Sequence, residues 1–141
     1  AVNADSGIET LADLAGKTMM VQSTTKPEEI FLAGTDPRIP QFGELLSTED
    51  RSIQYAMLNC GYVDAIAAHE TAILQYMQDC NANFRILEEP LLVTGIGVAF
   101  GLDEKLAETL AAMRADGTLK QIVGKYLPDP EKYLEVDALE P

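Results

Sequence analysis

The sequence predicts an α/β protein with a largely parallel sheet. Short apolar runs alternate with segments of helical periodicity along most of the 141 residues, and this alternation is typical of strands joined by crossover helices. Hydrophobic residues make up 47% of the chain, which argues against intrinsic disorder. No apolar run approaches the roughly 20 residues needed to cross a bilayer, and the length suits one domain of ordinary size.

Five segments have the composition of strands. They are rich in apolar and β-branched residues and are bounded by Gly, Pro or polar clusters, which mark turns. The strands are expected at 17–22, 41–46, 62–68, 84–87 and 93–100.

Five further segments are expected to be helical. Thr25 and Glu28 have the spacing of a capping box at the start of the first helix, and Ser47 and Thr48 are N-cap candidates for the second. The helices are expected at 27–33, 48–59, 69–77, 103–115 and 118–126.

The chain is strongly acidic. It has 10 basic and 23 acidic residues, which gives a formal net charge of −13 at pH 7. Binding to nucleic acid or to an anionic membrane requires clustered Lys and Arg, so neither is expected as a partner.

The chain has two cysteines and one histidine, which limits the disulfides, metal sites and catalytic mechanisms that it can form. Cys60 and Cys80 are too few for a disulfide framework or a four-ligand zinc site, and they either form one disulfide or remain two small, partly buried thiols. His69 is the only histidine, which excludes any mechanism or metal site that needs two. We expect no metal site, no cofactor and no catalytic residue.

A polar loop follows the first predicted strand after residue 17. Ligands of open α/β sheets bind beyond the carboxyl ends of the strands, at helix N-termini. Ser23, Thr24 and Thr25 place three hydroxyls and several backbone N–H groups there, which suits a carboxylate or a phosphate. The alternative is that Thr25 only caps the helix while the other hydroxyls face water. Glu28 and Glu29 add negative charge that weakens an anion site.

A second polar loop contains His69 and Glu70, directly after the apolar strand 62–68. We expect it at the same sheet edge as the first loop, where it can receive the polar or cationic end of a ligand. The alternative is that both residues simply occupy the first turn of a helix, where Glu is electrostatically favoured. Asp64 is expected to accept hydrogen bonds from nearby backbone N–H groups.

Short motifs along the chain match, in order, those of a known family. Together they resemble the second lobe of a bacterial extracellular solute-binding protein of family 3, the amino-acid-binding type that serves ABC importers, over about residues 5–127. The matching segments are 5–8, 11–18, Val21–Gln22 with Thr25, Gly61 with 63–67, 87–90, 95–100, and the ending from Leu110 through 116–118 to Ile122 and Lys125–Tyr126.

The resemblance implies a lobe of the periplasmic-binding-protein-like (type II) fold, with a mostly parallel sheet flanked by helices. It assigns residues 5–100 to the second lobe and 101–127 to helices that pack on a first lobe, which this chain lacks. Residues 128–141 are then a tail. Without the first lobe the two C-terminal helices expose apolar surface, so we expect a homodimer of this chain.

The resemblance also implies a function and its site. The chain would be the non-catalytic solute-binding component of an ABC-type importer for amino acids or similar small polar solutes. In the full-length protein it would be extracytoplasmic, lipid-anchored and partnered by the permease. The position matching Thr25 binds the ligand carboxylate through its hydroxyl and backbone N–H, and Ser23 and Thr24 line the same loop.

The position matching His69 is an Asp in the family, where it pairs with the ligand's α-ammonium group. A neutral imidazole accepts one hydrogen bond but supplies no counter-charge, so Glu70 is the adjacent substitute. This departure leaves other small polar solutes, including a dicarboxylate or a peptide fragment, open as ligands. A single lobe also leaves the site open to water, so we expect this chain alone to bind weakly.

Three other functions remain open from the sequence. The same fold can serve as an extracytoplasmic sensing domain of a membrane receptor. An enzyme on this scaffold would need an acid or base in the cleft, and only His69, Glu70 and Asp64 are available. An interaction module without a small ligand would lack a polar cleft near Thr25 and His69.

Overall fold

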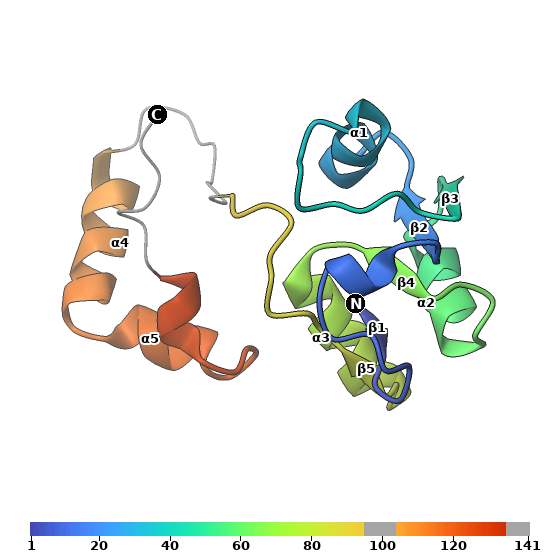
Figure 1. Ribbon diagram of the computed structural model, residues 1–141. Coiled ribbons are helices and arrows are strands. Elements are labelled where there is room, and N and C mark those ends of the chain that lie inside the picture. The colour runs from blue at the N-terminus through green and yellow to red at the C-terminus, as the bar shows by residue number, and fades with distance from the viewer. Residues whose placement is uncertain (95–103, 135–141) are drawn as a thin grey trace. The chain divides into compact units, whose positions relative to one another are not determined.

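A five-stranded mixed sheet organises the first part of the chain (Figure 1). The computed structural model describes residues 1–94 and 104–134, and the chain divides into two units, Ala1–Leu92 and Val93–Pro141. The strands of the first unit are β1 (Val2–Asn3), β2 (Thr18–Gln22), β3 (Glu44–Thr48), β4 (Ala65–Ala67) and β5 (Phe84–Arg85). They lie in the order β3-β2-β4-β1-β5.

The central strand β2 pairs in parallel with both of its neighbours. Met20 lies opposite Leu46 of β3 on one side and opposite Ile66 of β4 on the other. The short strand β1 is antiparallel to β4 and to β5, which makes the sheet mixed. Because β2, β3 and β4 are parallel, their carboxyl ends meet at one edge of the sheet.

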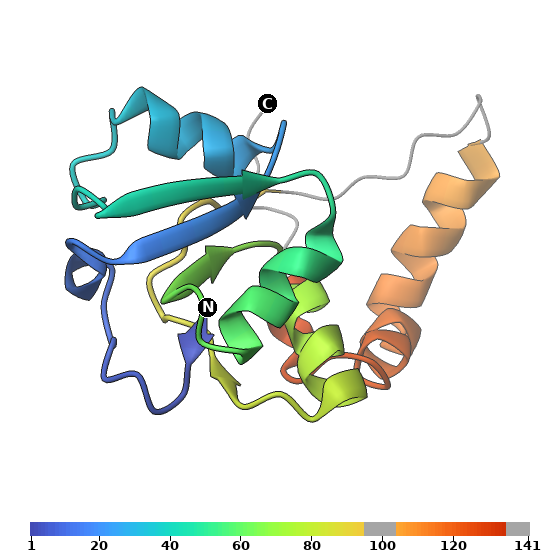
Figure 2. The same ribbon diagram turned by 90° about the vertical axis from the view of Figure 1, so that its right-hand side faces the viewer.

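The core of this unit lies on both faces of the sheet. Side chains alternate along β2, so that Met20 packs with Leu58 and Ile73 on one face, while Met19 and Val21 pack on the other. The first face is covered by α2 (Arg51–Asn59) and α3 (Glu70–Cys80), and the second by α1 (Lys26–Ala33) and a 3₁₀ turn at Ala12–Leu14 (Figure 2).

Helix α2 begins later than the sequence indicates. Strand β3 continues to Thr48, so that Asp50, and not Ser47 or Thr48, is the N-cap. The Asp50 carboxylate accepts hydrogen bonds from the backbone N–H of Ser52 at 2.8 Å and from its hydroxyl at 2.7 Å. An Asp at this position satisfies one of the orphan donors of the first turn, as Ser or Thr would.

Other boundaries also differ from the expected ones. Strand β4 is shorter than 62–68 because the chain reaches the sheet only after Asp64, whose carboxylate accepts from Thr18 N at 2.8 Å, as predicted for this residue. Helix α3 continues to Cys80 and ends at Asn81 in the left-handed conformation (φ 50°). The strand expected at 93–100 is irregular at 93–94, and 95–100 lie outside the described residues.

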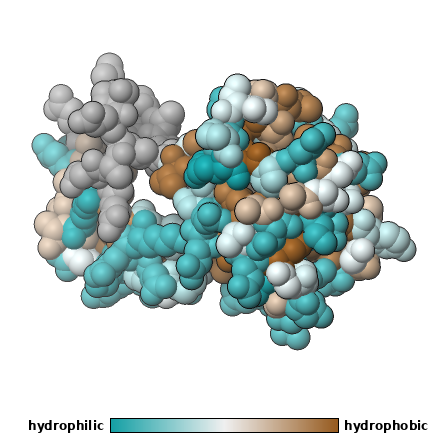
Figure 3. Space-filling view, viewed as in Figure 1, coloured by the Kyte–Doolittle hydropathy of each residue, from teal (hydrophilic) through white to brown (hydrophobic). Residues whose placement is uncertain are grey.

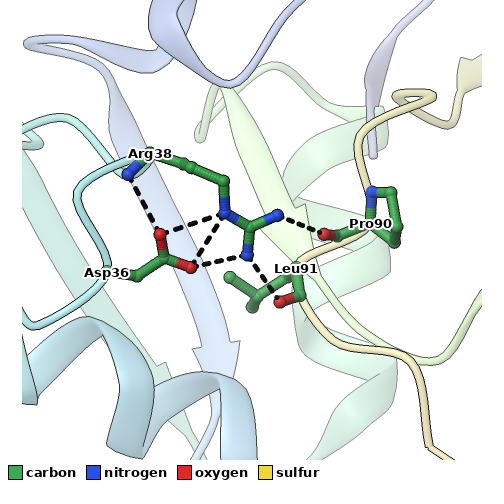
Figure 4. Close-up of polar contacts among 4 residues, drawn as sticks. All are labelled: Asp36, Arg38, Pro90 and Leu91. Atoms are coloured by element: carbon green, nitrogen blue, oxygen red, sulfur yellow. Dashed lines mark hydrogen bonds and ion pairs between the residues drawn. The ribbon is translucent and has the colours of Figure 1, made fainter.

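The segment that leaves the first unit is held by Arg38 in the loop after α1 (Figure 4). Its guanidinium pairs with Asp36 and also donates to the carbonyl oxygens of Pro90 and Leu91, both at 3.3 Å. The hydrogen bonds from Arg38 lower the pKa of the Asp36 carboxyl. One side chain thus joins two segments far apart in the sequence and fixes where the chain leaves this unit.

Both cysteines are free thiols, and both are exposed. Cys60 lies at the end of α2 and Cys80 at the end of α3. The structure therefore contains no disulfide, and the expectation of partly buried thiols is wrong.

The second unit contains two helices, α4 (Glu104–Ala115) and α5 (Thr118–Val123), and a 3₁₀ helix at Pro130–Tyr133. A Gly117 turn with φ 80° separates the two helices, and Lys120 of α5 forms an ion pair with Glu131. None of the side chains described at 105–134 is fully buried, and Tyr126 is 73% exposed. The expected homodimer stays a prediction, and 135–141 of the expected tail lie outside the described residues.

The surface of the first unit mixes polar and apolar groups. In the space-filling view hydrophobic colour gathers over α1 (Figure 3), the helix that carries Leu32, which is 71% exposed. Within the ranges that the structure covers, no helix is both long enough and apolar enough to span a membrane.

We predict that replacing Leu58 by Ala destabilises the first unit by about 2–5 kcal/mol. Leu58 is completely buried between α2 and the sheet, so truncation loses apolar contacts and leaves a cavity. Leu32→Ala is the matched control, because the same atoms are removed from an exposed site, and it should change stability by less than about 0.5 kcal/mol. Urea unfolding followed by circular dichroism measures both, and equal losses would contradict the assigned core.

Candidate ligand-binding site

Three loops meet at the carboxyl ends of β3, β2 and β4. Gln22 pairs with Thr48 at the end of β3, and Val21 pairs with Ala67 at the end of β4. The residues that follow these strands are 49–51, 23–25 and 69–70, and we call them the carboxyl edge. The structure thus confirms that Thr25 and His69 lie on the same edge of the sheet.

Loop 23–25 satisfies much of its own hydrogen bonding. Thr24 adopts a left-handed backbone (φ 60°), and its hydroxyl donates to Ser23 O at 2.7 Å. The Thr25 hydroxyl donates to Gln22 O at 2.5 Å. A hydroxyl has a single proton, so in this conformation neither threonine can donate its own to a ligand carboxylate. Ser23, whose hydroxyl has no partner among the described residues, and the N–H groups that start α1 are the donors that remain.

Glu28 connects the loop to two other elements. Its carboxylate accepts from Thr24 N at 2.7 Å and from the Ser47 hydroxyl of β3. Both hydrogen bonds lower the pKa of the Glu28 carboxyl, and the one from Ser47 has the larger effect. Thr25 occupies the N-cap position without a side-chain cap bond, so the predicted capping box is wrong, because Glu28 reaches one residue further back.

The second loop starts helix α3. His69 is the N-cap residue by position and is exposed, and Glu70 is the first residue of the helix and is half-buried. The His69 carbonyl oxygen accepts from the N–H groups of Ala72 and Ile73 at 3.0 and 3.1 Å, which begins the helix. His69 and Glu70 therefore lie at the start of a helix, which is the alternative to a ligand-binding role given above. They also lie at the same sheet edge as loop 23–25, which a ligand-binding role requires.

Sequence reasoning missed one cation at this edge. Arg51, the first residue of α2, donates from Nε to Gln22 Oε1 at 3.2 Å, and Gln22 Nε2 donates to Glu49 O at 3.1 Å. The sequence did contain a signal. A basic residue in the first turn of a helix opposes the helix dipole, so it is electrostatically unfavourable there.

A cavity of about 390 Å³ lies elsewhere, between Phe31 of α1 and residues 39–45, which include the start of β3. Its lining is mostly apolar and it does not include the carboxyl edge. In the described ranges no group of three or more His, Cys, Asp or Glu side chains is placed to hold a metal ion.

The sequence matches no family model and no curated protein. Among solved structures, the chain is similar to substrate-binding domain 2 of GlnP from Lactococcus lactis in its open conformation, with 26% identity and a TM-score of 0.69 over 89% of this chain and 56% of that chain. It is also similar to the second substrate-binding domain of a protein from Streptococcus pneumoniae assigned as an amino acid ABC transporter, with 27% identity and a TM-score of 0.65 over 90% of this chain and 59% of that chain.

A third similar structure is the substrate-binding protein of an amino acid ABC transporter, with 25% identity and a TM-score of 0.64 over 89% of this chain and 57% of that chain. These similarities confirm the resemblance drawn from the sequence motifs, and with it the α/β lobe of periplasmic-binding-protein-like fold. The chain spans less than two-thirds of the length of each of these proteins.

We predict that Glu28→Gln lowers the stability of the first unit at about pH 7 and has no effect at about pH 2. The folded-state pKa of Glu28 is lowered, so its contribution is present above the unfolded pKa and is lost as the pH falls through the folded value. Urea unfolding at both pH values measures the difference.

Glu29→Gln is the matched control. It removes the same charge from the same helical turn, but Glu29 pairs with Lys26 and not with loop 23–25. Identical pH profiles for the two variants would show that Glu28 does not hold loop 23–25.

Proposed function

We propose that this chain is one lobe of the non-catalytic solute-binding component of an ABC-type importer for amino acids or similar small polar solutes. The observation that carries the proposal is the carboxyl edge, where polar loops follow neighbouring parallel strands. Similarity to substrate-binding proteins of amino acid transporters supports it. The proposal includes an extracytoplasmic location, with lipid anchoring and a permease partner for the full-length protein.

Loop 23–25 receives the anionic group of the solute. The N–H groups at the start of α1 and the Ser23 hydroxyl are the donors available at this edge, and the helix dipole favours negative charge there. In this proposal the backbone N–H of Thr25, and not its hydroxyl, donates to the solute's anionic group, because the hydroxyl already donates to the carbonyl oxygen of Gln22.

His69 and Glu70 receive the cationic group. A carboxylate at Glu70 supplies the formal counter-charge for an ammonium, and a neutral His69 imidazole accepts one of its protons. The two ends of a zwitterion are then held by adjacent strands, which lie roughly 4.8 Å apart.

The remaining contacts come from the part of the similar proteins that this chain does not span. Charged hydrogen bonds are stronger in a closed, water-poor site than in an open one. One lobe alone therefore positions the solute but binds it weakly, and closure by a second lobe supplies most of the affinity.

We predict that L-glutamine binds this chain weakly and at the carboxyl edge. Titration followed by amide NMR should shift the signals of 22–25 and 67–70, with saturation only at millimolar concentrations, and calorimetry should detect no micromolar binding. Glu70→Gln should weaken the interaction about tenfold, because a charge-assisted hydrogen bond is lost. The control Glu9→Gln removes an exposed carboxylate that lies outside the carboxyl edge, and it should leave the interaction unchanged.

Two results would contradict this function. The first is micromolar binding by the chain alone, which would mean that one lobe suffices. The second is a set of shifts centred on Phe31 and 39–45, which would place the ligand in the cavity by α1 instead.

A further inference from the structure

We propose that the outer edge of β3 is a docking site for an extended peptide segment of a partner protein. The segment adds an antiparallel strand to the sheet and carries a large apolar side chain between basic residues. This inference goes beyond the proposed function, because it assigns a protein partner to a surface that binds no solute in that proposal.

Strand β3 lies at one end of the sheet, and β2 is its neighbour on one side only. It stands at the far right of the first unit in Figure 1. In Figure 2, which views the molecule from that side, no described helix lies in front of it. A further strand can therefore approach β3 from outside the sheet.

The register of β3 shows which of its residues face β2. Glu44 N donates to Lys17 O at 3.4 Å, and Ser23 N donates to Thr48 O at 2.8 Å. Because the backbone groups of successive residues in a strand point to opposite sides, residues 44, 46 and 48 face β2. The two residues between them face outward.

The outward residues are Leu45 and Ser47. Among the described residues, no hydrogen bond reaches the backbone N–H or C=O of either one. An added strand gains its affinity from main-chain hydrogen bonds to groups of this kind. The outer edge of β3 thus offers a row of free donors and acceptors.

This edge has little protection against pairing. Exposed edges are usually protected by Lys or Pro within the strand, by a bulge, or by a covering element. All residues of β3 pair in register with β2 without a bulge, and the strand contains neither Lys nor Pro. Its middle residues, 45–47, are uncharged. The edge is therefore suited to pairing with another strand.

The cavity of about 390 Å³ lies beside this edge. Its lining includes Leu45, together with Phe31 and Phe42, whose rings meet edge to face with 5.0 Å between their centroids. These three side chains pack on the α1 face of the sheet. A residue opposite Leu45 in an added strand points its side chain to the same face, so it would enter this cavity. The mostly apolar lining suits a large apolar side chain.

Acidic residues flank both ends of β3. Glu44 stands at its start and lines the cavity, and Glu49 and Asp50 follow its end. All three are exposed, and the cations at these ends, Lys17 and Arg51, form no ion pair with them among the described residues. A segment with Lys or Arg at both ends is complementary to this charge. A second copy of the chain, with a net charge of −13, would instead place acids beside acids.

The test adds the peptide acetyl-Lys-Thr-Val-Phe-Val-Thr-Lys-amide to the full chain. Amide hydrogen exchange followed by NMR should show rapid exchange at Leu45 and Ser47 in the free chain, and exchange at least about tenfold slower with saturating peptide. The N–H of Leu46, which faces β2, should change little. Amide shifts should move at 39–47 and not at 67–70.

Matched peptides separate the backbone from the side chains. With Phe opposite Leu45 in an antiparallel pair, the Phe N–H faces β3 and the N–H of the following Val faces away. N-methylation of Phe should abolish the slowed exchange, whereas N-methylation of that Val should retain it. Replacing Phe by Ala should weaken binding about tenfold, because the cavity is left unfilled.

Protein variants test the charge. Glu44→Lys should weaken binding of the peptide about threefold or more, and it should improve binding of the peptide in which both Lys are replaced by Glu. Glu9→Lys makes the same change at an exposed site away from β3 and should alter neither affinity. Thermal unfolding of each variant without peptide shows whether the fold is retained, and the peptide series tests the inference with the unaltered chain.

Four results would overturn the inference. The first is unchanged exchange at Leu45 and Ser47 at millimolar peptide. The second is equal binding of the two N-methylated peptides, which would exclude strand addition. The third is protection of both residues that rises with chain concentration in the absence of peptide, because a second copy would then be the occupant. The fourth is amide shifts at 67–70 without shifts at 39–47, which would place the peptide at the carboxyl edge.

Discussion

The parallel pairing of β2 with β3 and β4 is the constraint on which the rest of the structure depends. It aligns three carboxyl ends, so that each following loop starts at the same edge and each following helix directs its N-terminus there. The alternation of side chains along β2 then fills both faces with apolar groups, which fixes the register of the strand. The polar edge is a consequence of how the apolar core packs.

The edge balances stability against binding. Glu28 orders the loop by joining it to Ser47, but its carboxylate accepts the N–H of Thr24 and brings negative charge to the proposed anion site. Arg51 brings positive charge, but at a helix start where the dipole disfavours it. Each residue is unfavourable in one local respect, and with Glu49 and Asp50 directly before Arg51 the edge holds charges of both signs.

Sequence reasoning predicted strands that overlap β2, β3, β4 and β5 and the three α-helices of the first unit, because their apolar periodicity is local, but it missed the two-residue strand β1. It missed the N-cap of α2, since Ser47, Thr48 and Asp50 are all good caps and only the sheet decides where β3 ends. It predicted that Thr25 and His69 share an edge, which follows from parallel pairing alone. The hydrogen bond between Arg51 and Gln22 joins two segments far apart in the sequence, which no local pattern encodes. The hydrogen bonds that the hydroxyls of Thr24 and Thr25 donate lie within residues 22–25 and depend on the conformation of that loop.

The most direct test of this account measures proximity at the carboxyl edge. A nitroxide label is attached at Lys26→Cys in a background of Cys60→Ser and Cys80→Ser, and the broadening of amide NMR signals is recorded. The account predicts the strongest broadening, outside the labelled helix and its loop, at 49–51 and 69–70. The strongest broadening at 16–17 and 43–44, where β2 and β3 begin, would contradict it, because the loops would then lie on opposite edges of the sheet.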